Sequence, residues 1–458
     1  MGSVTQKLET QSVAKSFFQY FIPTLLGMML MSVNIVIDGI FVGNGVGSIA
    51  LASVNIAVPV FSVIISIALL IGMGGGTLYS MAMGENNKIK ARQIFTLSII
   101  LITVITIIIA VISYFNMESL ARFFGANRET MPYVLDYMGI LFISSLILSL
   151  EACLSIFIRN DGDPQLAMMG LVVSAILNIG LNYVMIFVLE LEVKGAAIAT
   201  VVATLAGLLI YTLHFFRKGS NLILTRFTWD WKQVKYLHVI GFPSFLSEAG
   251  MGVFIIGYNI TVAYYIGTEG LAAFSVINYL HTFMFLAFIG IASTIQPLIS
   301  YYYGSKQDAS IKKTIKLAER TGLALGILFL AIGYFGADYL VAIFGVESSA
   351  IAELASTGLK LFFIGYLFMG INFVYMTYYQ SIGNVKPSIM ITVFRGFILL
   401  ALMLFILPKI LGNAGIWLAL PAAEAMVAVF ILIFSRKNVM EKIFFPGTVP
   451  NQLLQLKR

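Results

Sequence analysis

Asp38 is the residue of this sequence whose type and position most favour chemistry, because it is an acid within an otherwise apolar run. A carboxylate in hydrocarbon is energetically costly, so it usually faces a cavity or a polar partner and marks a functional site. Gly27, Met31 and Asn34 precede it at successive spacings of four, three and four residues, so a helix would present all four residues on one face. We therefore predict that Asp38 carries a proton, with the Asn34 amide one turn away as its hydrogen-bond partner.

Three other acids, Glu151, Glu248 and Glu424, also lie inside apolar runs. Glu248 shares a helical face with Asn259, and we expect this face to contribute to substrate or cation binding. A buried, hydrogen-bonded acid is the structural alternative for Glu248. Arg395 is the only arginine inside an apolar run of the second half, so we expect it to form a structural ion pair with one of the acids.

Met31, His281 and Gln296 are further candidates for the lining of a substrate cavity. Flexible thioether side chains suit a pocket that accepts molecules of many shapes. Ordinary helix packing for the methionine, and simple hydrogen bonding for the histidine, remain the alternatives.

The segments that would position these residues occur twice in the chain. FIPTLLGMMLMSV, which contains Pro23, is echoed by GFPSFLSEAGMGV, which contains Pro243. LYSMAMGENNK is echoed by LISYYYGSKQD, and IRNDGDP is echoed by SIGNVKP, in the same order. Repeats of this length in a membrane chain are typical of two bundles that rock against each other around a central site.

The composition places most of the chain in lipid. Apolar residues make up 59% of it and charged residues 11%, whereas soluble proteins contain about 25% charged residues. The apolar runs predict an all-α integral membrane fold, with twelve transmembrane helices in two pseudo-symmetric six-helix lobes. The predicted spans are residues 16–42, 49–82, 94–115, 133–158, 166–189, 195–216, 239–264, 270–302, 318–344, 354–380, 388–410 and 415–435.

The charges of the loops predict the topology. We expect an N-terminal lobe at residues 1–220, a cytoplasmic linker at 221–238, a C-terminal lobe at 239–440 and a cytoplasmic tail at 441–458. Lys and Arg are concentrated in the loops on one side, and the positive-inside rule makes that side cytoplasmic. The chain is then a multi-pass protein of the plasma membrane with both termini in the cytoplasm, and its net charge of +7 indicates topology rather than a nucleic-acid partner. Six spans per half would align the repeat axis with the membrane normal.

Three long segments carry a family pattern. They are GMGGGTLYSMAMGENNKIKA (Gly72 to Ala91), IRNDGDPQLAMMGLVVSAILNIGLNYVMIF (Ile158 to Phe187) and YYQSIGNVKPSIMITVFRGFILLALMLFILPKILGNAGIWLALPAAE (Tyr378 to Glu424). Their order and spacing resemble the multidrug and toxic-compound extrusion (MATE) family, in particular its bacterial branch of DinF-like and MepA-like pumps. The resemblance covers nearly the whole chain. It implies two lobes that form a V, and export driven by a proton or sodium gradient.

The resemblance also implies roles for individual residues. Asp38 stands where proton-coupled members have their protonated aspartate. Asn178 and Asn182 lie one turn apart, where family members often have Asn followed by Asp, so Asn182 is a departure that leaves Asp38 as the only acid of that cluster. Tyr137 and Thr200 match positions that line the same cavity. Interhelical hydrogen bonding is the structural alternative for the two asparagines, Tyr137 and Thr200.

These observations together predict a secondary active multidrug antiporter. We expect a monomer, without cofactor or metal, that exports amphipathic and mostly cationic compounds in exchange for protons. Sodium coupling is one alternative, because the Asp38 cluster could also ligate sodium. A flippase for lipid-linked oligosaccharides, from the same superfamily, is another alternative. Its pyrophosphate cargo would call for several basic residues in the cavity, and the second lobe offers only Arg395 and Lys360.

An ATP-driven pump and an intramembrane enzyme are not expected. The segment GMGGGT lacks the Lys-Ser/Thr ending of a phosphate-binding loop and lies inside a predicted span. Neither H-E-x-x-H nor G-x-S-x-G occurs in the sequence.

Overall fold

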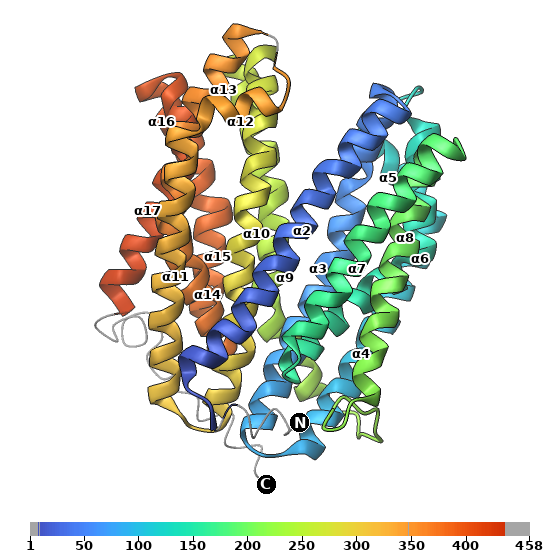
Figure 1. Ribbon diagram of the computed structural model, residues 1–458, viewed down its shortest axis with the longest axis vertical. Helices are drawn as coiled ribbons and strands as arrows, with labels where there is room; N and C mark the ends of the chain where they lie inside the picture. The colour runs from blue at the N-terminus through green and yellow to red at the C-terminus, as the bar shows by residue number, and fades with distance from the viewer. Residues whose placement is uncertain (1–7, 9, 347, 436–458) are drawn as a thin grey trace. The chain divides into compact units, whose positions relative to one another are not determined.

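The computed structural model describes residues 8, 10–346 and 348–435 (Figure 1). Within those ranges the chain forms helices joined by short loops and contains no β-strand. Among the described residues, eleven helices are long and apolar enough to cross a membrane, and one bent pair of helices brings the total to twelve if the pair counts as one span. The predicted all-α membrane fold is confirmed. The predicted tail at 441–458 lies outside the described residues.

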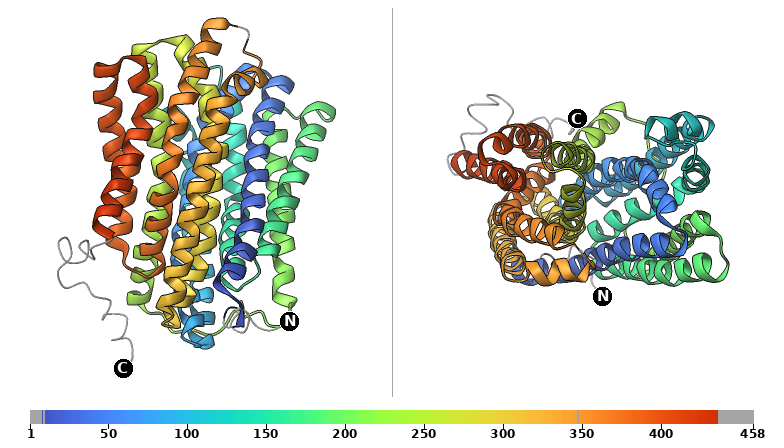
Figure 2. Two further views of the ribbon diagram at one scale, coloured as in Figure 1. Left: turned by 60° about the vertical axis from the view of Figure 1, so that its left-hand side comes forward. Right: turned by 90° about the horizontal axis from the view of Figure 1, so that it is seen from above.

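The chain divides into two compact units. Unit 1 comprises residues 1–249 and 300–308. Its long helices run side by side (Figure 1, Figure 2). The elements of unit 1 are α2 (Val13–Gly45), α3 (Ser48–Gly84), α4 (Lys88–Phe115), α5 (Met117–Phe123), α6 (Met131–Asn160), α7 (Pro164–Tyr183), the π-helical turn η1 (Val184–Val188), α8 (Glu192–Thr212), the 3-10 turn η2 (Leu213–Phe216) and, up to residue 249, α9 (Trp231–Tyr265).

Unit 2 comprises residues 250–299 and 309–458. It contains the remainder of α9 and most of α10 (Thr268–Gly304) and α11 (Asp308–Phe335). The other elements of unit 2 are α12 (Ala337–Ile343), α13 (Ser349–Phe362), the 3-10 turn η3 (Phe363–Gly365), α14 (Tyr366–Ser381), α15 (Val385–Val393), the π-helical turn η4 (Phe394–Ile398), α16 (Leu399–Leu411) and α17 (Asn413–Ser435).

A short helix follows the third long helix of each half, and it corrects one predicted span. The ninth span was expected at residues 318–344, but α11 ends at Phe335 and the chain bends by 76° into α12. α5 follows α4 in the same way. Gly336 separates α11 from α12, and Asp338 in the first turn of α12 is largely exposed. An acid here is more stable at the membrane surface than in hydrocarbon, so the apolar stretch after the bend does not continue the span.

Glycines in α3 allow neighbouring helices of unit 1 to pack closely. A Cβ atom added to Gly75 would overlap the Ser98 hydroxyl of α4, and one added to Gly74 would overlap the backbone of α9 at Leu237. Gly241 of α9 lies equally close to the α3 backbone at Leu70. The glycine-rich segment therefore serves helix packing, as small residues commonly do in membranes.

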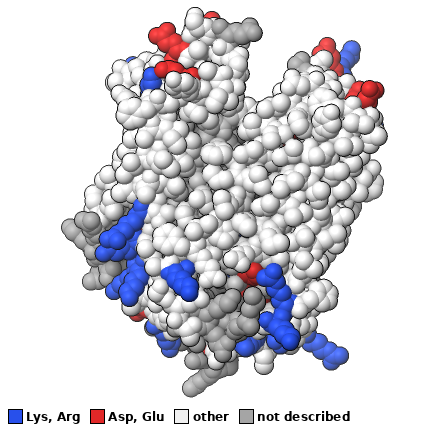
Figure 3. All heavy atoms as spheres, viewed as in Figure 1, with Lys and Arg blue, Asp and Glu red and all other residues white. Residues whose placement is uncertain are grey.

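The charged side chains separate along the long helices. In each unit, Figure 3 shows basic side chains gathered at one end and most of the acidic side chains at the other. We call the first the basic end. The loop between α3 and α4, the loop between α6 and α7, and the segment between η2 and α9 all lie at the basic end of unit 1 (Figure 1).

The first testable prediction concerns the orientation of the chain in the membrane. Lys235 and Thr268 are both exposed. Lys235 lies near the start of α9, and Thr268 is the first residue of α10, just after the end of α9. In a chain whose only cysteine, Cys153, has been replaced by alanine, a cysteine at Thr268 should react with an impermeant thiol reagent in intact cells. A cysteine at Lys235 should react only after the cells are permeabilised, because the basic end is predicted to be cytoplasmic. Labelling of position 235 from outside intact cells would contradict this topology.

Candidate functional site

Asp38 lies on α2, which packs closely against α7. A Cβ atom added to Gly27 of α2 would lie 3.2 Å from Cδ1 of Leu171 on α7, so the two helices have little space between them. Pro23, near the start of α2, cannot donate the backbone hydrogen bond of a regular helix. α7 continues into the π-helical turn η1, a feature that is frequent at functional sites. The close packing holds the face of α2 that carries Asp38 against α7.

Asparagine side chains surround the Asp38 carboxylate. Asn182 Nδ2 donates to Asp38 Oδ1 at 2.5 Å and lies 3.0 Å from Asn178 Oδ1. Asn34 Nδ2 donates to Asn178 Oδ1 at 2.9 Å and to the Ala175 carbonyl at 3.2 Å. The Asn34 amide was expected to bond Asp38, but it points across to α7, and the partner of Asp38 comes from α7 instead. On the far side of the cluster, Asn178 Nδ2 lies 3.2 Å from Thr200 Oγ1 of α8.

The Asn178 amide has two orientations with different consequences for Asp38. One terminal atom of the amide faces Asn34 and Asn182 and also lies 2.6 Å from Asp38 Oδ1. If this atom is the oxygen, it accepts from both asparagine amides, and its contact with Asp38 requires a proton on the carboxyl group. If it is the nitrogen, it donates to an ionised Asp38, and the oxygen accepts from Thr200 Oγ1. Each amide orientation therefore matches one protonation state of Asp38.

Tyr137 and Met31 are the remaining predicted residues near this cluster. Tyr137 of α6 lies within electrostatic range of Asp38, and its ring packs against an apolar group that includes Val42 and Ile186. Met31 is partly exposed on α2. The structure thus brings Asp38, Asn34, Asn178, Asn182, Thr200 and Tyr137 together within unit 1.

The other predicted substrate-binding residues lie elsewhere. Glu248 is a partly exposed residue of α9 in unit 1, whereas Asn259, on the same helix, belongs to unit 2 and is exposed. His281 is 2% exposed, and its Nδ1 lies 3.0 Å from the Tyr366 hydroxyl. Gln296 is also buried. His281 and Gln296 are therefore in the core of unit 2 rather than on an open cavity wall.

Arg395 forms the expected ion pair, and Glu424 is its partner. Arg395 Nε donates to Glu424 Oε1 at 2.5 Å, and Asn372 Nδ2 donates to Glu424 Oε2 at 2.6 Å. The guanidinium carbon also lies 4.1 Å from the centroid of the Phe373 ring. Both charged groups are buried. A buried pair that is hydrogen-bonded on several sides is a stable way to hold two charges in the core of unit 2.

A second charged cluster, at the basic end of unit 1, was not predicted. His214 of η2 lies between two acids of the α6–α7 loop, with Nε2 2.8 Å from Asp161 Oδ2 and Nδ1 3.3 Å from Asp163 Oδ2. A neutral imidazole donates only one hydrogen bond, so a ring with carboxylates at both nitrogens is the imidazolium form. Arg217 donates to Asp163 as well. Together the two acids and two bases have no net charge.

This basic-end cluster ties the start of the linker to the helices of unit 1. Tyr79 of α3 donates to Asp161 Oδ1 at 2.7 Å, and the Asn221 backbone N–H donates to Asp161 Oδ2 at 2.9 Å. Asp163 also caps α7 by accepting from the Leu166 N–H. Burial raises the pKa of Asp163, but the hydrogen bonds from His214 and Leu166 and the charge of Arg217 outweigh it and hold the pKa below its usual range. The two acids of the segment IRNDGDP are the signal in the sequence that points to this cluster.

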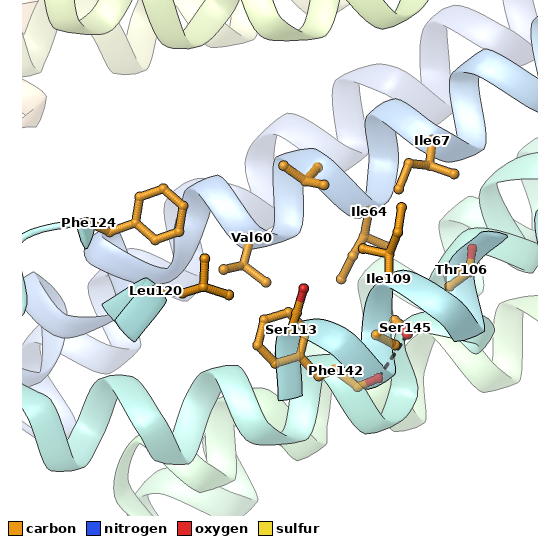
Figure 4. A pocket seen from close by; sticks show the side chains of 12 residues that line it. Val60, Ile64, Ile67, Thr106, Ile109, Ser113, Leu120, Phe124, Phe142 and Ser145 are labelled. Carbon is orange, nitrogen blue, oxygen red and sulfur yellow. Dashed lines mark hydrogen bonds between the residues drawn. The ribbon is translucent and has the colours of Figure 1, made fainter. Parts of the chain in front are cut away.

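An apolar cavity lies apart from these polar groups. It has a volume of about 150 Å³ and is bordered by α3, α4, α5 and α6 (Figure 4). Val60, Ile64, Leu120 and Phe142 face it, together with three hydroxyl-bearing residues and no charged one. It is therefore not a site for a cation. In the part of the chain that the structure describes, no group of three or more His, Cys, Asp or Glu side chains is placed to hold a metal ion.

Comparison with known proteins is consistent across sequence and structure. A family model described as MatE matches residues 23–184 and 243–406. The chain is 26% identical to the multidrug export protein MepA of Staphylococcus saprophyticus over 93% of this chain and 94% of that protein. It is 28% identical to the MepA of Staphylococcus haemolyticus over 94% and 95%, respectively.

The solved structures share the fold. A MOP-superfamily transporter from Pyrococcus furiosus matches with a TM-score of 0.89 at 22% identity, over 96% of this chain and 98% of that chain. A multidrug resistance MATE family transporter in an outward-facing conformation matches with a TM-score of 0.89 at 23% identity, over 94% and 97%. These matches span both units.

The second testable prediction concerns the basic-end cluster. Asp163→Asn should lower the free energy of unfolding at pH 7 by about 1–3 kcal/mol, because it leaves His214 and Arg217 with one carboxylate fewer. Unfolding can be followed in detergent with a thiol-reactive dye, since Cys153 is fully buried and is the only cysteine.

The pH dependence follows from the direction of the Asp163 pKa shift. A carboxyl group whose pKa is lower in the folded than in the unfolded protein stabilises the fold above its unfolded pKa, and the contribution is lost as the pH falls through the folded pKa. The difference between the parent and Asp163→Asn should therefore be constant from pH 7 to 5 and shrink below about pH 4. A difference that grows on acidification would contradict the assignment.

Proposed function

The chain belongs to the MatE family, and on this basis we propose that it is a secondary multidrug antiporter. It exports amphipathic, mostly cationic compounds from the cytoplasm in exchange for protons that enter. The observation that carries the proposal is the placement of Asp38 among the amides of Asn34, Asn178 and Asn182, within a multi-pass membrane protein. The similarity to multidrug export proteins supports the type of cargo.

Protonation of Asp38 would change the hydrogen bonds within the amide cluster. When Asp38 is protonated, it donates to Asn178 Oδ1, which keeps its hydrogen bonds from Asn34 and Asn182. When Asp38 is ionised, the Asn178 amide turns its nitrogen to the carboxylate and loses those two hydrogen bonds. The two states therefore differ in how firmly α2 is joined to α7. A cargo molecule that binds one of these states more tightly than the other can exchange with the proton.

Two features of α2 would allow this helix to move when Asp38 gains or loses its proton. Pro23 interrupts the hydrogen-bond ladder of the helix, and Gly27 places no side chain between α2 and α7. When the asparagine contacts change, α2 can repack at these positions without breaking a regular helix. Met31 lies on the same face and moves with Asp38.

The cluster favours a proton over sodium as the coupling ion. A sodium ion needs several oxygen ligands with free lone pairs. The Asn182 amide nitrogen faces Asp38 Oδ1, and the Asn34 and Asn182 nitrogens face Asn178 Oδ1. These N–H groups occupy lone pairs of Asp38 Oδ1 and Asn178 Oδ1. Asn182 Oδ1, which has no hydrogen-bond partner among the described residues, would be left as a free amide oxygen for sodium, whereas a proton on Asp38 requires no ligand shell.

The buried charges favour a cationic or neutral cargo over a lipid-linked pyrophosphate. Arg395 is neutralised by Glu424. Lys360 is partly exposed and lies 3.9 Å from Asp338. A polyanionic headgroup would need several free basic side chains, and these two both have acidic neighbours. The acids Asp38 and Glu248 are partly exposed and suit a positively charged cargo.

The third testable prediction separates coupling from binding. Asp38→Asn imitates the protonated state at nearly the same volume, so the protein should fold and bind cationic dyes. In proteoliposomes it should lose efflux driven by a proton gradient, because it no longer exchanges a proton. The parent should respond to an imposed proton gradient and not to a sodium gradient at equal pH. Parent-level, proton-driven export by Asp38→Asn would refute the assignment.

The fourth testable prediction concerns the cargo. Glu248→Gln should weaken the efflux of cationic compounds by about tenfold, corresponding to about 1.4 kcal/mol, because an attractive charge is removed. The efflux of neutral compounds of similar size should stay within about twofold, a difference below about 0.5 kcal/mol. The measurement is a panel of paired cationic and neutral dyes in cells that express equal amounts of each variant. An equal loss for both classes would make Glu248 a structural residue, and transport of anionic sugar lipids alone would favour the flippase.

A further inference from the structure

Glu151 is a half-buried acid of unit 1 to which the coupling scheme above gives no role. It lies on α6, nine residues before the end of that helix. The last residue of α6, at the basic end, is therefore about 14 Å away along the helix axis. Its Oε1 atom is inaccessible to solvent and, in the described part of the chain, has no hydrogen-bond partner. An ionised carboxylate with one oxygen left unpaired in this way would be strongly destabilising.

The hydrogen bond of Tyr211 leaves Glu151 without a donor from that side chain. The Tyr211 hydroxyl of α8 donates to the Ala167 carbonyl at 3.0 Å. A phenol has a single hydrogen to donate, so Tyr211 does not stabilise an ionised Glu151 in this arrangement. Together with the unpaired Oε1 atom, this favours the protonated form of the Glu151 carboxyl group.

Few charges face Glu151, and they are favourable to its ionised form. Tyr211 faces it from α8, and Arg159 lies two turns further along α6, with Nη1 3.0 Å from Ser155 Oγ. The facing stretch of α7, residues 167–174, has no titratable side chain. The positive charge of Arg159 can therefore balance Glu151 when its proton leaves.

One face of α8 connects Glu151 with the Asp38 cluster. Thr200, Thr204, Gly207 and Tyr211 follow one another at spacings of four, three and four residues, so they share a face of the helix. Thr200 contacts Asn178 of the Asp38 cluster at one end of this face, and Tyr211 contacts Glu151 at the other.

Gly207 brings α8 close to Glu151 in the middle of this face. A Cβ atom added to Gly207 would lie 3.0 Å from the Gly170 carbonyl and 3.6 Å from Glu151 Oε1. The unpaired oxygen therefore points at the polar face of α8. The separation from Gly207 to Thr200 is about 10 Å along the helix. Ser174, Thr200 and Glu151 are each partly exposed.

We propose that Glu151 is a second proton-binding residue of unit 1, which exchanges protons with the Asp38 cluster along the polar face of α8. This inference rests on the proposed function. The Asp38 carboxylic acid gives its proton to a chain of water and hydroxyl groups beside Thr200 and Thr204, and the chain delivers a proton to the Glu151 carboxylate. Glu151 later releases it toward the basic end of unit 1. Charge and protons balance, because one carboxyl group is deprotonated as the other is protonated.

The test compares two modes of transport in proteoliposomes. Efflux driven by a pH gradient requires proton transfer, whereas exchange of labelled for unlabelled cationic dye at equal pH does not. Glu151→Gln keeps the volume and a hydrogen-bond donor at this position, so it should fold. We expect it to slow pH-driven efflux at least roughly tenfold, to flatten the dependence of that efflux on cytoplasmic-side pH, and to leave dye exchange at the parent rate.

Matched threonine variants test the path. Thr204→Val removes a hydroxyl group from the polar face of α8 at nearly constant volume, and it should slow pH-driven efflux but not dye exchange. Thr212→Val is the control. The Thr212 hydroxyl donates to the Leu209 carbonyl of the same helix, as the Thr204 hydroxyl donates to the Thr200 carbonyl, but Thr212 lies off this face. It should behave as the parent in both assays.

The outcomes separate this inference from the proposed function. If Asp38→Asn loses pH-driven efflux while Glu151→Gln matches the parent in rate and pH profile, the proton-coupled function stands and the role of Glu151 is refuted. If Glu151→Gln slows both transport modes equally, Glu151 is a packing residue and the inference is again refuted. If Asp38→Asn exports normally under a pH gradient, the proposed function itself fails.

Discussion

The absence of water from the hydrocarbon core is the constraint on which this structure depends. Every polar group placed there must find its partner within the protein. The backbone meets this requirement through helices, and each acid within the spans meets it differently. Asp38 is bonded by Asn182, and Glu424 is bonded by Arg395 and Asn372. Glu151, which has an unpaired oxygen, meets it by holding a proton in the scheme that we propose. The type of partner decides whether an acid can change its charge during a transport cycle.

The two units solve this problem in opposite ways. In unit 1, the neighbours of Asp38 are amides, which can donate or accept and so tolerate either charge state, and Glu151 has no cation bonded to it among the described residues. In unit 2, Glu424 faces a guanidinium group that is always charged. Removing the negative charge there would leave a buried, unpaired cation. The repeat thus preserves the helices but not these polar contacts, and the proton exchange that we propose is confined to unit 1.

The sequence predicts the helices well because their signal is local. Apolar runs and their repetition indicate the spans, and the spacing from Gly27 to Asp38 indicates a shared face. What it predicts poorly is which residue of another helix lies opposite. Asn34 bonds α7 instead of Asp38, and His281 is enclosed by the core of unit 2, because both outcomes depend on helix packing. Likewise, Asp161 and His214 lie 53 residues apart and become a pair only in three dimensions.

The hydrogen bonds that join the linker to the α6–α7 loop and to α4 limit where the chain could be cut into two fragments. The Asn221 N–H binds Asp161, and the Thr225 N–H binds Thr96 on α4 at 3.0 Å. The first part of the linker is thus structurally a part of the bundle that precedes it. A split protein, with the two halves synthesised as separate polypeptides, would keep its first fragment intact only if the break lies beyond Thr225. A break at Ser220 would instead remove the backbone donor of a buried carboxylate from the fragment that needs it.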